Sequence, residues 1–175
     1  MMPLSMSRVL PMLCFALAVS LGSTVTAAQP TQAPPADARV AFDRLVALAG
    51  SWQHEGSGVA VDFRLSAGGS VVVETWTLRS GRESLTLYHL DGDRLLATHY
   101  CPQGNQPRLE LTERRKDGSL VFTLESVTNL SPGGSHQHDL ELQLEPERLV
   151  RTEVYRSSKG DSRDVYTMKR VASDG

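Results

Sequence analysis

The sequence predicts an all-β fold, an antiparallel up-and-down barrel of about ten strands preceded by a short helix. From residue 51 onward, apolar and polar residues alternate with a period of two, the pattern of half-buried strands. The strands are joined mostly by tight turns, and no helical stretch is long enough for the crossover that parallel strands require. Many twisted strands in one chain tend to close, because closure removes exposed edges. An open half-barrel or a sandwich is the alternative.

Residues 1–28 have the pattern of a cleavable secretion signal. Arg8 supplies positive charge, Val9–Leu21 is almost wholly apolar, and the small residues Thr26-Ala27-Ala28 form a cleavage site. The apolar run of 13 residues is too short to span a hydrocarbon layer of ~30 Å. We therefore expect a periplasmic or secreted protein that does not insert into a membrane after cleavage.

A flexible leader and a helix are expected next. Residues 29–38 hold three prolines and little that could be buried, which indicates a flexible Pro-rich leader. Asp37 can cap a helix whose apolar residues in Val40–Ala49 follow a 3.6-residue period, and Gly50 would end it. The barrel domain is expected to cover residues 39–172.

The expected strands then follow one another to the end of the chain. The dipeptide Asp91-Gly92 between two of them is a strong hairpin signal, and Lys116-Asp117-Gly118 is a further turn. The strands are expected at Trp52–Gly56, Val59–Leu65, Ser70–Leu78, Glu83–Leu90, Arg94–Cys101, Arg108–Arg114, Leu120–Leu124, His138–Leu144, Leu149–Tyr155 and Arg163–Val171.

Charge and cysteine content exclude some classes of protein. Removal of residues 1–28 takes away Arg8 and no acidic residue, which leaves 17 Lys and Arg against 20 Asp and Glu. A nucleic-acid partner is not expected, because such proteins need a concentrated basic surface. Cys14 lies in the signal, so Cys101 has no partner for an intrachain disulfide. The sequence carries no signal for the oligomeric state.

A resemblance to known barrels begins at Leu48-Ala49-Gly50-Ser51-Trp52. A helix leading into Gly-x-Trp on the first strand of a ten-strand meander resembles the calycins, which include lipocalins, fatty-acid-binding proteins and nitrobindin-like barrels. The segments Tyr88–Asp93 and His99–Arg108 are similar to exported bacterial proteins with a lipocalin-like domain. The resemblance covers roughly residues 42–171.

The resemblance also implies roles for particular residues. In calycins the first-strand Trp closes the base of the barrel and a last-strand Arg crosses its face, positions that match Trp52 and Arg170, as a structural pair. Nitrobindin-like barrels bind haem through a histidine near the chain end. This chain has no histidine after His138, so no cofactor is expected.

The segment from His99 to Arg108 is the expected ligand-binding region. Asn105 and Gln106 offer amide groups, and Arg108 offers a forked cation for the polar end of a ligand. Alternatively these side chains satisfy the backbone groups of their own loop. The same predicted site includes His99 and Tyr100 of this segment, and His89 and Glu74 from other strands. If Glu74 faces inward, it is an acidic group in an apolar cavity.

Two other arrangements of side chains could carry chemistry. His99 and Cys101 share a strand face and could form a nucleophile and its base, but no third, orienting group is evident. His136 and His138 have a spacing that zinc can use, although two histidines beside a Pro-Gly-Gly loop are more often structural. No catalytic or metal-ligating residue is assigned.

Three functions follow from these observations. The favoured one is an exported binding protein that holds a small, mostly apolar molecule in the barrel. The second is a hydrolase or isomerase that uses His89, His99 and Glu74. The third is a structural or interaction domain with a filled core.

The secretion-signal pattern predicts the start of the exported protein. Cleavage after Ala28 would leave Gln29 as the first residue. N-terminal sequencing of the chain recovered from outside the cytoplasm should therefore read Gln-Pro-Thr. A chain that still begins at Met1 there would contradict cleavage.

Overall fold

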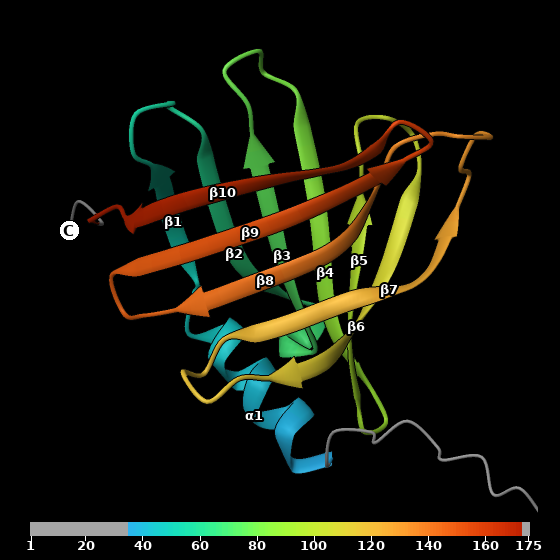
Figure 1. Ribbon diagram of the computed structural model, residues 1–175. Coiled ribbons are helices and arrows are strands. Elements are labelled where there is room, and N and C mark those ends of the chain that lie inside the picture. The colour runs from blue at the N-terminus through green and yellow to red at the C-terminus, as the bar shows by residue number, and fades with distance from the viewer. Residues whose placement is uncertain (1–34, 173–175) are drawn as a thin grey trace, which may run out of the picture. The chain divides into compact units, whose positions relative to one another are not determined.

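The computed structural model describes residues 35–172, and the expected signal at 1–28 and the first part of the leader lie outside the described residues. One helix, α1 (Pro35–Val46), and a short 3-10 turn, η1 (Ala67–Gly69), accompany the strands (Figure 1). The strands are β1 (Gly50–His54), β2 (Ala60–Ser66), β3 (Val71–Thr77), β4 (Glu83–Asp91), β5 (Arg94–Tyr100), β6 (Gln106–Arg114), β7 (Leu120–Thr128), β8 (His136–Leu144), β9 (Arg148–Ser157) and β10 (Gly160–Arg170).

The strands form one closed barrel, which confirms the predicted fold class. Each strand pairs antiparallel with its neighbours in the sequence, and β1 pairs with β10 to close the ring. Every strand faces the same interior, so each contributes alternate residues to one core. This closed ten-strand barrel fits a calycin-like fold.

The helix differs from its expected bounds. It begins at Pro35, a residue type favoured in the first helical turn because proline lacks the N–H that would remain unpaired there. It ends at Val46, and Gly50 is the first residue of β1 instead of the helix cap. Gly50 has φ of 122°, and a Cβ there would lie 3.2 Å from Nη1 of Arg170. The glycine is therefore required by the strand and its arginine neighbour.

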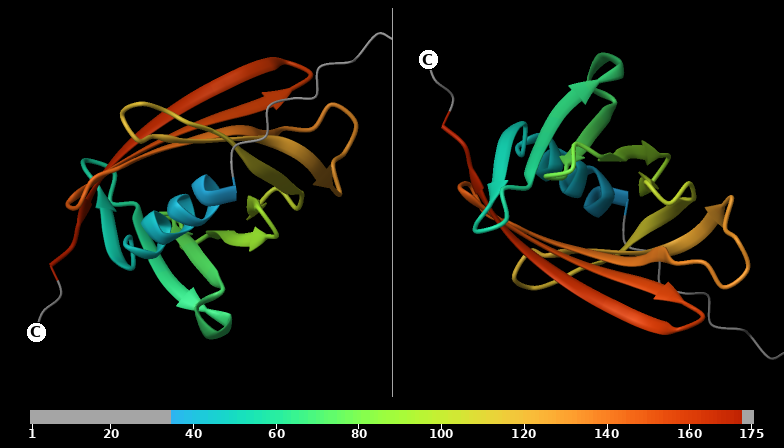
Figure 2. Two further views of the ribbon diagram at one scale, coloured as in Figure 1. Left: turned by 90° about the horizontal axis from the view of Figure 1, so that it is seen from below. Right: turned by 90° about the horizontal axis from the view of Figure 1, so that it is seen from above.

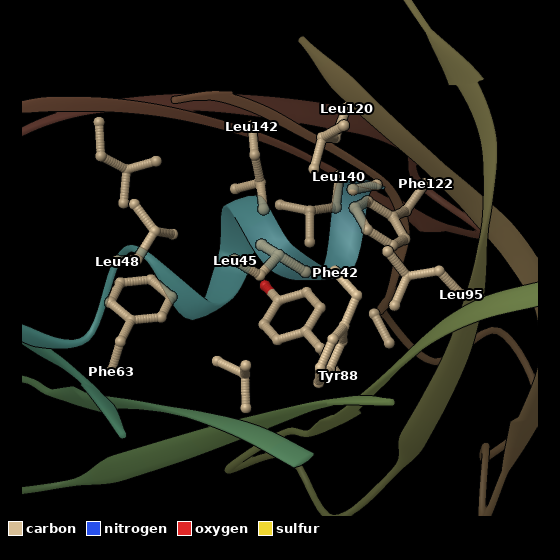
Figure 3. Close-up of a cluster of buried hydrophobic side chains, with 14 of the residues drawn as sticks. Phe42, Leu45, Leu48, Phe63, Tyr88, Leu95, Leu120, Phe122, Leu140 and Leu142 are labelled. Atoms are coloured by element: carbon tan, nitrogen blue, oxygen red, sulfur yellow. The ribbon is translucent and has the colours of Figure 1, made fainter. Parts of the chain in front are cut away.

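Helix α1 fills one end of the barrel (Figure 2). Figure 3 shows its apolar side chains interleaved with those of the strands. The Arg44 guanidinium holds the helix in place by donating to the carbonyl oxygens of Gly118 and, at 3.1 Å, Leu144. This half of the barrel is an apolar core that includes Phe42, Leu45, Leu48, Phe63, Leu95, Leu120, Phe122, Leu140 and Leu142.

Trp52 and Arg170 join the barrel seam to the segment after α1. They are register partners on β1 and β10, and the guanidinium carbon lies 4.4 Å from the centroid of the fully buried indole. The indole N–H donates to the carbonyl of Leu48 at 2.8 Å. Arg170 itself donates to the carbonyls of Ala47 and Ala49 at 3.0 and 2.8 Å, so one side chain satisfies two backbone carbonyls of the segment between α1 and β1.

The barrel is paired unevenly at the end opposite α1. β1 pairs with β10 at three positions only, from Trp52 to His54, although β10 is 11 residues long. β7 likewise pairs with β8 at four positions, from Leu120 to Thr123. The ring is therefore tight around the helix and open at the mouth, where the strands diverge (Figure 1).

Replacing Trp52 with alanine should unfold much of the population. The change removes a buried indole, its hydrogen bond to Leu48 and the surface that carries Arg170, and such truncations cost ~3–5 kcal/mol. Urea unfolding followed by circular dichroism measures the loss. Val165→Ala, at a β10 residue that is 54% exposed, is the control and should change stability by no more than ~0.5 kcal/mol. Equal stability of the two variants would contradict this role of Trp52.

Candidate functional site

A pocket of about 510 Å³ occupies the mouth of the barrel, at the end away from α1. Its walls come from β3, β4, β5, β9 and β10 and from the β1–β2, β3–β4, β5–β6 and β7–β8 loops, which meet at this end because the strands form a meander. The lining mixes apolar, aromatic and charged side chains: Ser57, Val59, Trp76, Leu78, Arg82, Ser84, His99, Cys101, Pro102, Gln103, Ser135, Glu153, Tyr155, Ser162, Asp164 and Tyr166.

A buried ion pair connects the lining of this pocket with the apolar core. Arg151 on β9 donates through Nη1 to Oε1 and Oε2 of Glu74 on β3, at 2.6 and 2.8 Å. Both side chains are fully buried, and 77 residues separate them in the sequence. Glu74 therefore faces inward, as one interpretation of the sequence required. The pair crosses the barrel interior between two strands that are not neighbours.

Two aromatic side chains complete the coordination of Glu74. The hydroxyl of Tyr88 donates to Oε2 at 2.5 Å, and the indole N–H of Trp76 donates to Oε1. Burial, followed by the carboxylate of Glu74, raises the pKa of Tyr88 well above its usual range, so the phenol keeps its proton. The Tyr88 ring packs against Phe122 at 5.8 Å between centroids and links the ion pair to the apolar core (Figure 3).

Arg151 also connects the ion pair to the pocket wall. Its Nε donates to Oε1 of Glu153 at 2.6 Å, and its guanidinium carbon lies 5.1 Å from the Trp76 ring centroid. Burial alone would lower the pKa of Arg151, but the carboxylates of Glu74 and Glu153 hold it well above its usual value. Within the described residues, Nη2 of Arg151 is buried with no hydrogen-bond partner, as are both amide atoms of Gln137 on β8.

His99 is held as a neutral ring at the pocket wall. Its Nδ1 is 3.0 Å from the hydroxyl oxygen of Thr86 and its Nε2 is 3.3 Å from that of Tyr155. Burial, with a further contribution from the Arg151 cation, lowers the pKa of His99 to about 3. The ring is therefore neutral near pH 7 and does not change its charge between pH 6 and 7, where an ordinary histidine would titrate.

The geometry does not support a Cys101–His99 nucleophile. Cys101 follows the end of β5, and its sulfur accepts a hydrogen bond from the backbone N–H of Gln103 at 3.5 Å. Both ring nitrogens of His99 are engaged elsewhere. Burial raises the pKa of the Cys101 thiol, which disfavours the reactive thiolate.

The histidines considered for zinc lie apart from the pocket. The rings of His136 and His138 are 6.3 Å apart, and His138 contacts Asp139 and Arg156. Among residues 35–172, no group of three or more His, Cys, Asp or Glu side chains is placed to hold a metal ion.

Four of the predicted ligand-binding residues lie on the opposite face of the sheet from His99. His89, Tyr100, Gln106 and Arg108 line a separate pocket of about 540 Å³ on the outside of β3 to β7. The reason is the two-residue period: His99 points inward, so Tyr100 and Thr98 point outward, and Arg108 shares the face of its register partner Thr98. The structure does not bring these four residues to the mouth of the barrel.

The remaining predicted residue, Asn105, serves its own loop. Its amide nitrogen donates to the carbonyl of Ser135 at 2.9 Å, and its side chain is buried. Gln106 likewise donates to the carbonyl of Gly104 at 2.8 Å. These bonds match the alternative in which polar side chains of this segment satisfy backbone groups.

Several pocket residues were not anticipated from the sequence. Arg151, Glu153 and Tyr155 alternate along β9 on the face of the buried Leu149. That alternation was a usable signal, but Val150 and Val154 on the other face made the opposite orientation equally plausible by hydrophobicity. Trp76 lies two residues from Glu74 on the same face of β3, and Asp164 and Tyr166 lie within the last expected strand.

No protein-family model and no curated protein matches this chain. Within the described residues, no helix is both long and apolar enough to cross a membrane. The function is therefore argued from the pocket itself.

The lowered pKa of His99 predicts an acid-dependent loss of stability. Below the unfolded-state pKa of 6.5, the unfolded chain binds a proton that the folded chain refuses until about pH 3, so stability falls as the pH is lowered. Replacing His99 with glutamine removes this effect. The free energy of unfolding is measured at pH 6.5 and at pH 4. Its decrease between these two pH values should be about 2–3 kcal/mol smaller in the variant than in the parent.

Thr86→Val is the control for this measurement. It removes the hydroxyl that contacts His99 but no titrating group, so it should lower stability while leaving the pH dependence in place. If His99→Gln retains the full pH dependence of the parent, His99 titrates normally in the folded protein and the assignment is incorrect.

Proposed function

We propose that this chain is an exported lipocalin-like protein that binds a small molecule in the mouth of its barrel. The observation that carries the proposal is the division of the interior: α1 and the apolar core fill one half, and the other half holds a pocket of about 510 Å³. A pocket of this volume falls within the range of sites for small ligands. Export is supported by the signal pattern of residues 1–28.

The pocket combines apolar surface with fixed polar groups. Arg151 holds Glu153, and His99 holds Tyr155, so these polar side chains are positioned before any ligand arrives. Pre-positioned groups lose little conformational entropy on binding. Val59, Leu78 and Trp76 add apolar surface, so the best ligand has an apolar or aromatic body and a polar end.

A bulky residue at Ser84 should abolish binding. Ser84 lines the pocket opposite Trp76, and a phenylalanine there would occupy the ligand volume. Binding is measured with the neutral dye Nile red by fluorescence titration, and with native mass spectrometry of the protein purified from its host. We expect Ser84→Phe to lower the dye affinity at least about tenfold, the loss of roughly 1.4 kcal/mol, and to remove any co-purified mass.

Leu85→Phe is the matched control. Leu85 is the next residue on the same strand, is 38% exposed and points to the outside, so the same aromatic group is added away from the pocket. Its dye affinity should equal that of the parent. Equal losses of dye affinity in both variants, or no loss in either, would contradict binding in this pocket.

A further inference from the structure

Three aromatic side chains line the pocket. Trp76 and Tyr166 meet edge to face, with centroids 5.0 Å apart, and Tyr155 lines the same pocket from β9. Aromatic rings attract cations through the negative potential of their faces, and the attraction is strongest where water is excluded. Burial raises the pKa of both Tyr155 and Tyr166, so the phenols remain neutral.

Two carboxylates stand directly opposite each other beside these rings. Glu153 on β9 and Asp164 on β10 are register partners, and both line the pocket. Like charges at opposed positions of a strand pair repel each other and destabilise the sheet. Glu153 is bonded to Arg151, whereas within residues 35–172 no cation forms an ion pair with Asp164.

The formal charges around the pocket leave a negative excess. The buried Arg151 cation is matched by the buried Glu74. Among the described residues that line the pocket, that leaves Glu153 and Asp164 against one cation, Arg82, which is exposed and donates to the carbonyl of Pro102 at 3.3 Å. His99 adds no positive charge near neutral pH. A carboxylate ligand would therefore enter a site with an excess of carboxylates, and a cation would relieve their repulsion.

We propose that the pocket selects an organic cation, an ammonium group joined to an apolar body, over neutral and anionic molecules of the same shape. This inference rests on the proposed function. The ammonium group would lie between the aromatic rings and the pair Glu153 and Asp164, with its apolar body against Val59 and Leu78.

Three probes that share an eight-carbon chain test this selectivity. Octyltrimethylammonium, 1-octanol and octanoate differ in the charge of the head group, and their binding to the parent protein is followed by calorimetry and by the change in tryptophan fluorescence. We expect the cation to bind at least about tenfold more tightly than octanoate, with 1-octanol between them. The preference should shrink in concentrated salt.

Asp164→Asn tests the residue assignment. It removes one exposed charge that forms no ion pair within residues 35–172, so the protein should fold. The variant should bind the cation roughly fivefold more weakly and bind 1-octanol with unchanged affinity. Asp93→Asn is the matched control, because Asp93 is an exposed residue in the β4–β5 turn at the opposite end of the barrel and carries the same charge. Its affinities should equal those of the parent.

The outcomes separate this inference from the proposed function. Tightest binding of octanoate, equal binding of all three probes, or equal effects of Asp164→Asn and Asp93→Asn would overturn the selectivity for cations while leaving a binding pocket. Failure of the parent to bind any of the three probes or Nile red would overturn the proposed function and this inference with it.

Discussion

The ion pair between Glu74 and Arg151 organises the interior of this barrel. A fully buried guanidinium is tolerated only when its charge is matched and its donors are used, and Glu74, Glu153 and Tyr88 supply most of that compensation. Because the pair links β3 to β9 across the interior, it sets the depth at which the apolar core stops. Removing either residue would leave the other as an unpaired buried charge. The cost of that unpaired charge would exceed the loss of packing by the removed side chain.

The two ends of the barrel are built for different purposes. At the closed end, α1, Trp52 and Arg170 satisfy backbone carbonyls and shield the seam between β1 and β10. At the open end, short pairing of β1 with β10 and of β7 with β8 leaves the strands apart. Stability is therefore concentrated around the helix, and the mouth can carry charged groups such as Glu153 opposite Asp164.

The predicted site residues lie on both faces of the sheet, because successive side chains of a strand point to opposite faces. The segment from His99 to Arg108 does reach the pocket, through His99, Cys101, Pro102 and Gln103. Its cation, Arg108, faces the other way, so the charge that was expected to receive the polar end of a ligand is outside the barrel. The cations that do approach the pocket are Arg151, which is neutralised, and Arg82. The pocket lining therefore carries more carboxylates than free cations, which the sequence did not indicate.

The sequence by itself determined the number of strands, their order and the closure of the barrel, because alternation and turn residues such as Asp91-Gly92 act over a few neighbouring residues. It also indicated the positions of Trp52 and Arg170 through the family resemblance. Only the tertiary structure decided which polar side chains face inward and which meet. Glu74 and Arg151 become partners because closure brings together strands 77 residues apart, and no local pattern encodes such a contact. Where both faces of a strand carry apolar residues, as on β9, only the register of the closed barrel selects the face that lines the pocket.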